Sequence, residues 1–335
     1  YCLQKKIYKW KHRPEFKLIK TFQTVITDDL DLAKNILNSG GVIAIPTETV
    51  YGLAGNAMDT NSIASIFRIK NRPYFNPLIA HIGEIEQLKS LCNTIPVEAQ
   101  KLIDAFWPGP LTLVLSKKKS VPNLLTSGLD KVAVRMPSHP LTLKLLKSIK
   151  YPLAAPSANP YKYVSPTSAQ HVESQLGSAI PLILDGGQCK IGLESTIIGF
   201  EDNDVVIYRL GGLTIESIEE VLKKPIAIKT KSESDTLPGQ EKKHYSPGKE
   251  IVLIPFAGAL PSLVSPDVLI TWKPQESSYK SISLDGSDIS GASRIFSLLR
   301  ELDNPQIGKI FIELAPEKGL GKAINDRLMR AAYPF

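Results

Sequence analysis

Short apolar runs rich in β-branched residues alternate with helical patterns along most of this chain. The run 41–45 is the first clear strand, and the segment 30–37 before it has apolar residues at helical spacing, with Asp28 or Asp29 as the cap. Further strand-like runs lie at 78–82, 111–115, 132–136, 153–155, 181–185, 195–200 and 205–210. Helical patterns separate many of them. This alternation predicts an α/β domain that covers roughly residues 21–225.

Residues 226–249 differ in character from the chain on either side. They are polar and rich in turn formers, which is typical of a flexible tether. The pair His244-Tyr245 favours a lid instead, because an aromatic ring and an imidazole are unusual in a solvated linker. Residues 250–335 again alternate strand-like and helical patterns, which predicts a small second α/β domain with its own core.

The net charge of +7 is concentrated at the start of the chain. Residues 1–20 contain seven lysines and arginines against the single acid Glu15, so the rest of the chain is almost neutral. This basic extension could contact RNA or a membrane surface, but a solvated terminus is the more common outcome. The chain starts at Tyr1, so a targeting peptide could have been removed, although Glu15 and the lack of serine enrichment do not favour one.

Other bulk features bear on several classes of protein. The three cysteines (Cys2, Cys92 and Cys189) form no paired motif, so we expect a reducing interior such as the cytoplasm. The five histidines lack metal-ligand spacing, and a zinc site is not expected. No apolar run approaches the roughly 20 residues that span a bilayer, so no membrane partner is predicted.

The segment Pro46–Leu53 directly follows the strand 41–45 and carries Thr47, Glu48 and Thr49. It brings hydroxyls and a carboxylate to the carboxyl end of a strand, where ligands bind in open α/β sheets. Taken alone, a threonine-rich β-turn explains the segment equally well. The later motifs favour a binding site in which Thr49 is the principal residue, and they leave Glu48 without a role.

Cations and amides follow the next helical pattern. Lys70 and Arg72 would lie at a helix C-terminus, where the helix dipole favours cations. Alternatively they form an anion clamp, with bidentate contacts from arginine and a point charge from lysine. Asn76 and His81 follow at the start and inside of a strand. A single histidine in an apolar strand is more often a hydrogen-bonded core residue than a catalyst.

Arg135 lies inside the apolar run 132–136, and Lys131 stands just before that run. A buried charge is costly unless it is paired. The partner of Arg135 is therefore either a carboxylate of the protein or the carboxylate of a ligand.

Small polar residues stand at the ends of several other strand-like runs. Ser157 and Asn159 follow one strand, and Ser165 precedes a helical pattern, where it would either cap the helix or contact phosphate. Ser195 and Arg209 lie at the ends of two later runs. No Walker loop, dinucleotide fingerprint or nucleophile set is present. The pattern indicates a site that binds a polyanion and a small polar molecule, and acts by positioning and charge neutralisation.

Taken together, these motifs resemble the YrdC-type threonylcarbamoyl-AMP synthase family over about residues 25–335. They occur in family order: Pro46–Leu53, Lys70-x-Arg72, Asn76-Pro77-Leu78, His81, Trp107–Thr112, Val132–Pro137, Ser157-x-Asn159, Ser165-Pro166-Thr167 and Leu193–Ile197. The long, two-domain form is indicated by Pro238-Gly239, His244-Tyr245-x-Pro247 and the terminal pattern Gly319–Ala332. Each motif alone is weak, but the ordered set is specific. The resemblance implies a YrdC-like twisted open α/β sheet domain followed by a small Rossmann-like α/β domain.

The resemblance also implies a reaction. L-Threonine and bicarbonate would combine to an N-carboxylated threonine, whose carboxylate attacks the α-phosphate of ATP to give threonylcarbamoyl-AMP and pyrophosphate. Mg²⁺ would accompany the phosphates, with no protein side chain assigned as its ligand. The product would pass to the machinery that transfers the threonylcarbamoyl group to adenosine 37 of tRNA, and weak RNA binding is a further possibility.

Site residues follow from the same resemblance. Lys70 and Arg72 would be catalytic. Threonine would be held by Thr49, His81, Arg135, Ala155 and Ser195. ATP would be held by Arg72, Asn76, Lys131, Ser157, Asn159, Ser165, Arg209 and Tyr245, the last reaching back from the linker as a lid.

Two positions depart from the family pattern. Tyr161-Lys162 stands where the family has Ser-Gly, and Lys131 where it often has threonine. The alternative function is a double-stranded-RNA or tRNA-binding module without catalysis. The basic residues 1–20 are the feature that suggests it. A third interpretation, a carbamoyl-transfer enzyme, requires zinc-finger and acylphosphatase-like regions that this sequence does not contain.

Overall fold

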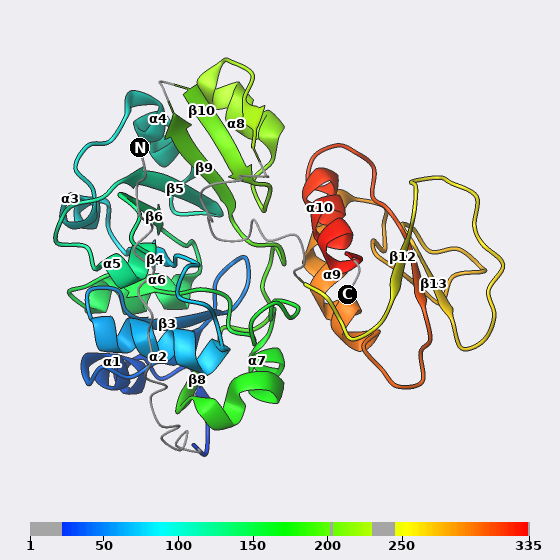
Figure 1. The fold of residues 1–335 in the computed structure, drawn as a ribbon, viewed down its shortest axis with the longest axis horizontal. Coiled ribbons are helices and arrows are strands. Elements are labelled where there is room, and N and C mark those ends of the chain that lie inside the picture. Colours follow the sequence, from blue (N-terminus) through cyan, green and yellow to red (C-terminus); the bar gives the residue numbers. More distant parts are fainter. Residues whose placement is uncertain (1–21, 202–203, 230–244, 334–335) are drawn as a thin grey trace, which may run out of the picture.

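The computed structural model describes the chain except residues 1–21, 202–203, 230–244 and 334–335. It places one eleven-stranded mixed sheet before residue 230 and a four-stranded parallel sheet after residue 244 (Figure 1). The expected α/β architecture, a twisted sheet domain followed by a small α/β domain, is therefore confirmed. The basic extension 1–20 and His244 lie outside the described residues.

The elements have the following bounds. In spatial order the first sheet contains β1 (Val25–Thr27), β8 (Leu182–Leu184), β2 (Ile43–Ile45), β3 (Gly52–Asn56), β7 (Leu153–Ala154), β4 (Ile79–His81), β6 (Lys131–Arg135), β5 (Leu111–Ser116), β9 (Thr196–Glu201), β10 (Asp204–Arg209) and β11 (Ala227–Ile228). The second contains β12 (Ile251–Ile254), β15 (Ile310–Glu313), β13 (Val268–Thr271) and β14 (Lys280–Ser281). The helices are α1 (Leu30–Asn38), α2 (Thr60–Lys70), α3 (Leu88–Leu91), α4 (Val97–Phe106), α5 (Asn123–Thr126), α6 (Pro140–Ser148), α7 (Ala169–Leu176), α8 (Ile215–Leu222), α9 (Asp288–Glu301) and α10 (Gly321–Ala331), with 3-10 turns η1 (Ile85–Gln87) and η2 (Gly177–Ala179).

Strand β3 is an element that the sequence pattern did not predict. Its sequence, Gly-Leu-Ala-Gly-Asn, has low β propensity, yet it pairs antiparallel with β2. Gly52 forms a bridge with Ser157, and a Cβ at Gly52 would lie 3.2 Å from the Cβ of Ala155. A larger residue at this position would therefore crowd the side chain of Ala155. The segment Pro46–Leu53 therefore follows the end of β2, as expected, and turns the chain back into β3.

The register of the central strands gathers polar residues from distant parts of the chain. His81 on β4 pairs with Arg135 on β6, and Thr112 on β5 pairs with the same Arg135. Strand β9 begins at Thr196, opposite Leu111 at the start of β5, which places Ser195 next to this group. These polar positions come together at one end of the central strands.

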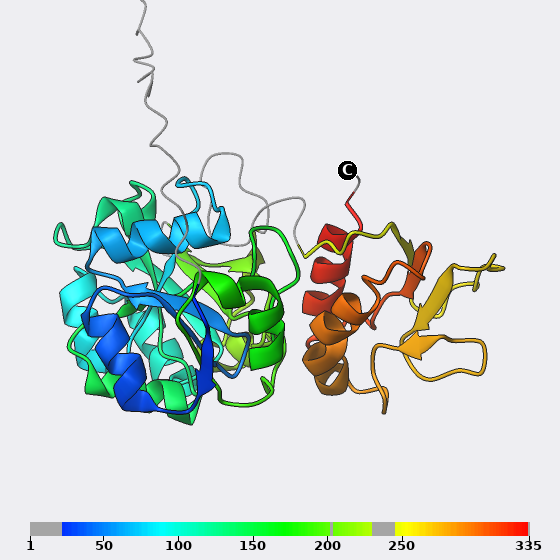
Figure 2. The same cartoon turned by 90° about the horizontal axis from the view of Figure 1, so that it is seen from below.

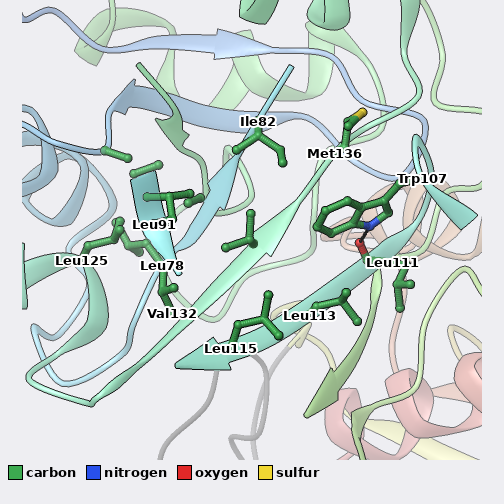
Figure 3. Packing of buried hydrophobic residues seen from close by; sticks show 14 of the residues in the cluster. Leu78, Ile82, Leu91, Trp107, Leu111, Leu113, Leu115, Leu125, Val132 and Met136 are labelled. Carbon is green, nitrogen blue, oxygen red and sulfur yellow. Dashed lines mark hydrogen bonds between the residues drawn. The ribbon is translucent and has the colours of Figure 1, made fainter. Parts of the chain in front are cut away.

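A large apolar core underlies this arrangement. Leu113, Val132 and Leu78 belong to one buried cluster between the sheet and its helices (Figure 3). Trp107, which ends α4, packs in the same cluster and donates from Nε1 to the carbonyl of Leu111 at 2.8 Å. Burial of such side chains is the main source of stability. The core thus fixes the strand ends on which the polar residues lie.

Helices α9 and α10 lie side by side between the small parallel sheet and the first domain (Figures 1 and 2). A second apolar cluster crosses this boundary and joins Val50 and Val164 of the first domain to Phe296 and Leu328. The second domain therefore shares a core with the first. Among the described residues, no helix is long and apolar enough to cross a membrane.

Candidate active site

A cavity of about 60 Å³ lies at the ends of the central strands and in the adjoining loops. It is lined by Thr49, Val50, Arg72, Pro77, Leu78, Ile79, His81, Arg135, Ala155, Pro156, Ser157, Glu194, Ser195, Arg209 and Tyr245. All five residues predicted to hold threonine contribute to this lining. So do four of the residues predicted to hold the nucleotide: Arg72, Ser157, Arg209 and Tyr245.

The hairpin between β2 and β3 presents Thr49 to the cavity. The Thr47 hydroxyl donates to the carbonyl of Val50 at 2.6 Å and accepts from the backbone amides of Thr49 and Val50. A threonine that bonds its own turn in this way fixes the backbone path. Thr47 thus holds Thr49 in place, with 2.8 Å between their hydroxyl oxygens.

Arg135 pairs with a carboxylate of the protein itself. Its Nη2 lies 2.7 Å from Oε1 of Glu48, and its Nη1 donates to the Thr49 hydroxyl at 2.9 Å. The second Glu48 oxygen accepts from the backbone amide of Ser138 at 3.0 Å. Of the two partners that the sequence left open, a protein carboxylate is present, and Glu48 gains a role. Arg135 still lines the cavity, so its predicted contact with a ligand stays a prediction.

Arg209 holds Ser195, and both residues line the cavity. Its Nη2 donates to the backbone carbonyl and the hydroxyl of Ser195 at 2.8 and 3.0 Å. The Ser195 hydroxyl also lies 2.7 Å from that of Thr112. Burial lowers the pKa of Arg209 to about 10, so the guanidinium remains charged at neutral pH.

Glu194 is a second buried carboxylate at the cavity. It accepts from the Ser165 hydroxyl at 2.6 Å and from Nε of Arg327 at 2.9 Å. Burial raises its pKa, but the charges of Arg327 and Arg209 and the bond from Ser165 outweigh burial and lower the pKa to about 2. Ser165, predicted to contact ATP, therefore orients Glu194 and does not itself line the cavity.

His81 is neutral at physiological pH. Burial, and secondarily the charge of Arg135, lower its pKa to about 3. Its Nδ1 lies 3.2 Å from the carbonyl oxygen of Ile79. His81 can therefore offer a neutral imidazole to a ligand in the cavity, where a second cation beside Arg135 would be costly.

Lys70 is not among the residues that line the cavity. As the last residue of α2 it is 2% exposed, and its Nζ donates to the backbone carbonyls of Ser157 and Asn159, each at 2.5 Å. Burial, with the charge of Arg72 as the second cause, lowers the pKa of Lys70 well below its ordinary value. In this geometry Lys70 holds the loop that carries Ser157.

Arg72 reaches the cavity with its neighbours Asn76 and Tyr161. It donates from Nε to the carbonyl of Asn76 at 3.3 Å, and its guanidinium carbon lies 5.9 Å from the centre of the Tyr161 ring. Asn76 donates to the Tyr161 hydroxyl at 2.8 Å. Tyr161, one of the departures from the family pattern, therefore braces both residues, and the adjoining Lys162 takes a positive φ of 71°.

Asn159 and Lys131 do not line the cavity either. The Asn159 side-chain amide donates to the carbonyls of Pro160 and Tyr163 at 2.8 and 2.9 Å, so it shapes the loop. Lys131 is exposed at the start of β6, the end of the strand opposite Arg135. Their predicted roles in ATP binding, like those of Asn76 and Ser165, stay predictions.

Tyr245 lines the cavity and packs against the second domain. It is 1% exposed and has a left-handed backbone with φ of 62°. Its ring stacks on Phe296 of α9 at 5.3 Å between centres, and the guanidinium carbon of Arg327 lies 5.1 Å from the ring centre. The expectation that this part of the linker reaches back to the first domain agrees with this position.

Several residues around the cavity were not assigned from the sequence: Thr47, Thr112, Glu194 and Arg327. All four stood inside recognised motifs, and an acid next to Ser195 before an apolar strand was a signal that could have been used. Among the described residues no group of three or more histidines, cysteines or carboxylates could hold a metal ion. Glu194, which lines the cavity, and Glu48, which bonds Arg135 of the lining, are both already paired with arginines.

Comparison with known proteins agrees with this geometry. A family model described as "Telomere recombination", covering Sua5, YciO and YrdC, matches residues 35–211. A second model, "Threonylcarbamoyl-AMP synthase, C-terminal domain", matches residues 213–333.

Similar proteins cover almost the whole chain. The threonylcarbamoyl-AMP synthase of Pyrococcus abyssi is 39% identical over 90% of this chain and 93% of its own length. That of Bacillus subtilis is 36% identical over 92% and 96%, respectively.

Two solved structures share the fold. The crystal structure of P. abyssi Sua5 complexed with L-threonine has a TM-score of 0.84 and 36% identity, and covers 92% of this chain and 98% of that one. A P. abyssi variant with an adjacent histidine and tyrosine replaced by alanine has a TM-score of 0.85 at 36% identity, over 92% and 96%. Both domains are thus matched in sequence, and 92% of the chain in fold. The chain belongs to the Sua5/YrdC family of threonylcarbamoyl-AMP synthases, in its long, two-domain form.

Proposed function

We propose that this protein is an L-threonylcarbamoyladenylate synthase. The threonine nitrogen attacks the carbon of bicarbonate, and loss of water leaves an N-carboxylated threonine. One oxygen of the new carboxylate then attacks the α-phosphorus of ATP, and the bond to the bridging oxygen breaks to release pyrophosphate. The observation that carries this proposal is the cavity in which Arg135, Thr49 and Ser195 converge beside Arg72 and Arg209.

We place threonine against Thr49, His81, Arg135, Ala155 and Ser195. Arg135 has a guanidinium at the cavity, and the Glu48 carboxylate holds it in a fixed position. A fixed cation suits the carboxylate of an amino acid, and the hydroxyls of Thr49 and Ser195 suit its polar groups. The similar crystal structure of P. abyssi Sua5 is a complex with L-threonine, which supports this placement.

We place ATP beside threonine, on the side of Arg72, Ser157 and Arg209. Two arginines flanking a small cavity neutralise phosphate charge and stabilise the charge that develops as pyrophosphate leaves. Three further residues support ATP binding indirectly, by holding loops and neighbouring side chains: Asn76, Asn159 and Ser165. Lys131 extends the positive surface. Lys70 fixes the loop that carries Ser157. We assign Lys70 to the catalytic machinery in this supporting role.

Mg²⁺ accompanies the nucleotide in this proposal. It usually keeps several waters and binds substrate phosphates with few protein carboxylates. That habit fits a site whose two carboxylates, Glu48 and Glu194, are held by arginines. The ion therefore reaches the site on the phosphates.

We assign residues 21–225 to catalysis, 226–249 to a linker and lid, and 250–335 to the second domain. The edge strand β11 extends the first sheet to Ile228, so the linker begins just beyond it. Tyr245 lines the cavity, which supports a lid role. Exclusion of water by such a lid would protect an easily hydrolysed carboxylated intermediate. We further propose that the protein works in the cytoplasm and passes its product to the tRNA threonylcarbamoyl-transfer machinery. RNA binding by residues 1–20 is a separate proposal.

The test is pyrophosphate release from ATP with Mg²⁺, bicarbonate and a panel of amino acids. Threonine should accelerate release well above glycine or leucine, and omission of bicarbonate should abolish the effect. Arg135→Met should lose threonine dependence, whereas Lys309→Gln, which alters an exposed ion pair far from the cavity lining, should retain it. Release no faster with threonine than with leucine would contradict the proposed function.

A further inference from the structure

Glu194 raises an electrostatic problem for a site that binds phosphates. It is 6% exposed and lines the cavity together with Arg72 and Arg209. An uncompensated carboxylate there would repel a polyanion and would be costly to bury. Glu48, the other carboxylate near the cavity, is neutralised by Arg135 of the same domain.

Arg327 of α10 provides the compensation for Glu194, and it belongs to the second domain. It is 0% exposed, and its Nε lies 2.9 Å from Oε2 of Glu194. Asp326 contacts Nη1 of Arg327 at 2.5 Å, but Asp326 also pairs with Arg330 at 3.0 Å. Two arginines and one aspartate leave a net positive charge on α10, and Glu194 balances it.

The same guanidinium touches three parts of the cavity's surroundings. Besides Glu194 before β9, its Nη2 donates to the carbonyl of Leu210 just after β10 at 2.7 Å. Its guanidinium carbon lies 5.1 Å from the centre of the Tyr245 ring. Arg327 therefore joins two strand ends and the lid residue.

Arg209 is the group that loss of Arg327 would disturb. Its guanidinium donates to the carbonyl and the hydroxyl of Ser195, while the nearby charge of Glu194 acts on its pKa. Because Arg327 satisfies Glu194, Arg209 remains on Ser195 with its positive charge available to a ligand. An unpaired Glu194 would compete for Arg209 and would cancel that charge.

We propose that Arg327 is a positioning residue of the nucleotide site: it neutralises Glu194 and thereby reserves Arg209 for the phosphates of ATP. The second domain is then part of the active site through one buried ion pair. This inference rests on the proposed function, because it takes a nucleoside triphosphate as the ligand. It goes beyond that function by giving the second domain an electrostatic task.

The competing explanation is purely structural, with Arg327 serving only to dock the second domain. The two explanations differ in what happens when Glu194 is changed as well. If the damage in an Arg327 variant comes from the bare carboxylate, removing that charge should repair ATP binding. If the damage comes from lost docking, removing a second interface partner should make it worse.

The experiment measures binding of a non-hydrolysable ATP analogue with Mg²⁺ by calorimetry, in the full-length protein, for Arg327→Gln, Glu194→Gln and the double variant. Threonine-dependent pyrophosphate release gives kcat and KM for ATP and for threonine in parallel. We expect Arg327→Gln to weaken analogue binding and raise KM for ATP at least tenfold, with a smaller change in KM for threonine. The double variant should return to within about threefold of the parent protein.

Lys322→Gln is the matched control. Lys322 is on the same helix and pairs at 2.7 Å with Glu216 of the first domain, but it lies outside the cavity lining. It should leave analogue affinity and KM for ATP within twofold. Circular dichroism and thermal unfolding establish that each variant is folded.

Several outcomes would overturn the inference. A double variant that binds the analogue no better than Arg327→Gln would do so, as would normal affinity in Arg327→Gln. Should Arg327→Gln not fold, Glu194→Gln alone decides: it must bind the analogue at least as tightly as the parent, and weaker binding rejects the proposal. If the parent binds the analogue but releases no threonine-dependent pyrophosphate, the proposed reaction fails, while the calorimetric comparison still tests Arg327.

Discussion

Two buried arginine–glutamate pairs flank the cavity, and they are built in different ways. Glu48 and Arg135 both belong to the first domain, with side chains 7% and 5% exposed. Glu194 and Arg327 are as deeply buried, at 8% and 0%, but the arginine comes from the second domain. The first pair makes the cavity a property of one sheet. The second makes it depend on how two domains meet.

The largest expected effect comes from breaking the pair within the first domain. Glu48→Ala leaves Arg135 charged and buried, and removal of one partner of such a pair costs about 3–5 kcal/mol of unfolding free energy. Urea denaturation measures it. Glu250→Ala, at an exposed pair with Lys309, is the control and should cost no more than about 1 kcal/mol. A loss at Glu48 as small as that of the control would mean that Arg135 gains other compensation.

The pair between the domains should be visible in the pH dependence of stability. The pKa of Glu194 falls from an ordinary value of 4.5 to about 2 on folding, mainly because Arg327 and Arg209 outweigh the effect of burial. The stabilisation is therefore present above pH 4.5 and is lost as the pH falls toward 2. At 1.36 kcal/mol per pKa unit it amounts to about 3 kcal/mol.

The measurement is urea unfolding of the parent protein and Glu194→Gln from neutral pH down to about pH 3. The parent should lose more stability on acidification than the variant, which lacks this carboxyl group. Parallel curves would show that the Glu194 pKa does not differ between the folded and unfolded states.

The first pair was within reach of sequence reasoning, and the second was not. Arg135 stood out because a charge interrupts an apolar strand, and Glu48 lay in the adjacent recognised motif. Glu194 and Arg327 are 133 residues apart, and their contact depends on the packing of two domains. Periodicity and propensity describe local sequence, so they cannot predict a contact between residues that are so far apart in the chain.

Local conformation limited the prediction at two other places. Strand β3 was not predicted because glycine and alanine have low β propensity. Its pairing is decided by tertiary contacts with β2 and β7. Lys70 was recognised as a cation of the site, but the sequence could not tell that its ammonium group turns to two backbone carbonyls. The direction of a long side chain at a helix end is set by the loop that it meets.

His81 provides a smaller test, on the side of the first pair. Its pKa falls from 6.5 to about 3, first because of burial and then because of the Arg135 charge. The unfolded chain binds the proton below pH 6.5 and the folded chain does not, so stability decreases as the pH falls below 6.5. Between about pH 7.5 and 5 the contribution is about 2 kcal/mol.

His81→Asn should remove this contribution, and the difference between its stability curve and that of the parent isolates His81 from the other histidines. The imidazole resonances of His81 in a nuclear magnetic resonance titration should also show no protonation near pH 6.5. Protonation in that range would mean that the Arg135 charge is better screened by Glu48 than the geometry indicates.

The smallest expected effect comes from an ion pair between the same two domains that is not buried. Lys322 and Glu216 are 2.7 Å apart, but their side chains are 30% and 51% exposed. Solvent screens such a pair, so Lys322→Gln should cost less than about 1 kcal/mol, and added salt should reduce even that. Unfolding in low and high salt measures it. If Lys322→Gln instead destabilised the protein as much as Arg327→Gln, charge on α10 in general would hold the domains together. The buried pair of Arg327 and Glu194 would then contribute no more to domain docking than an exposed pair.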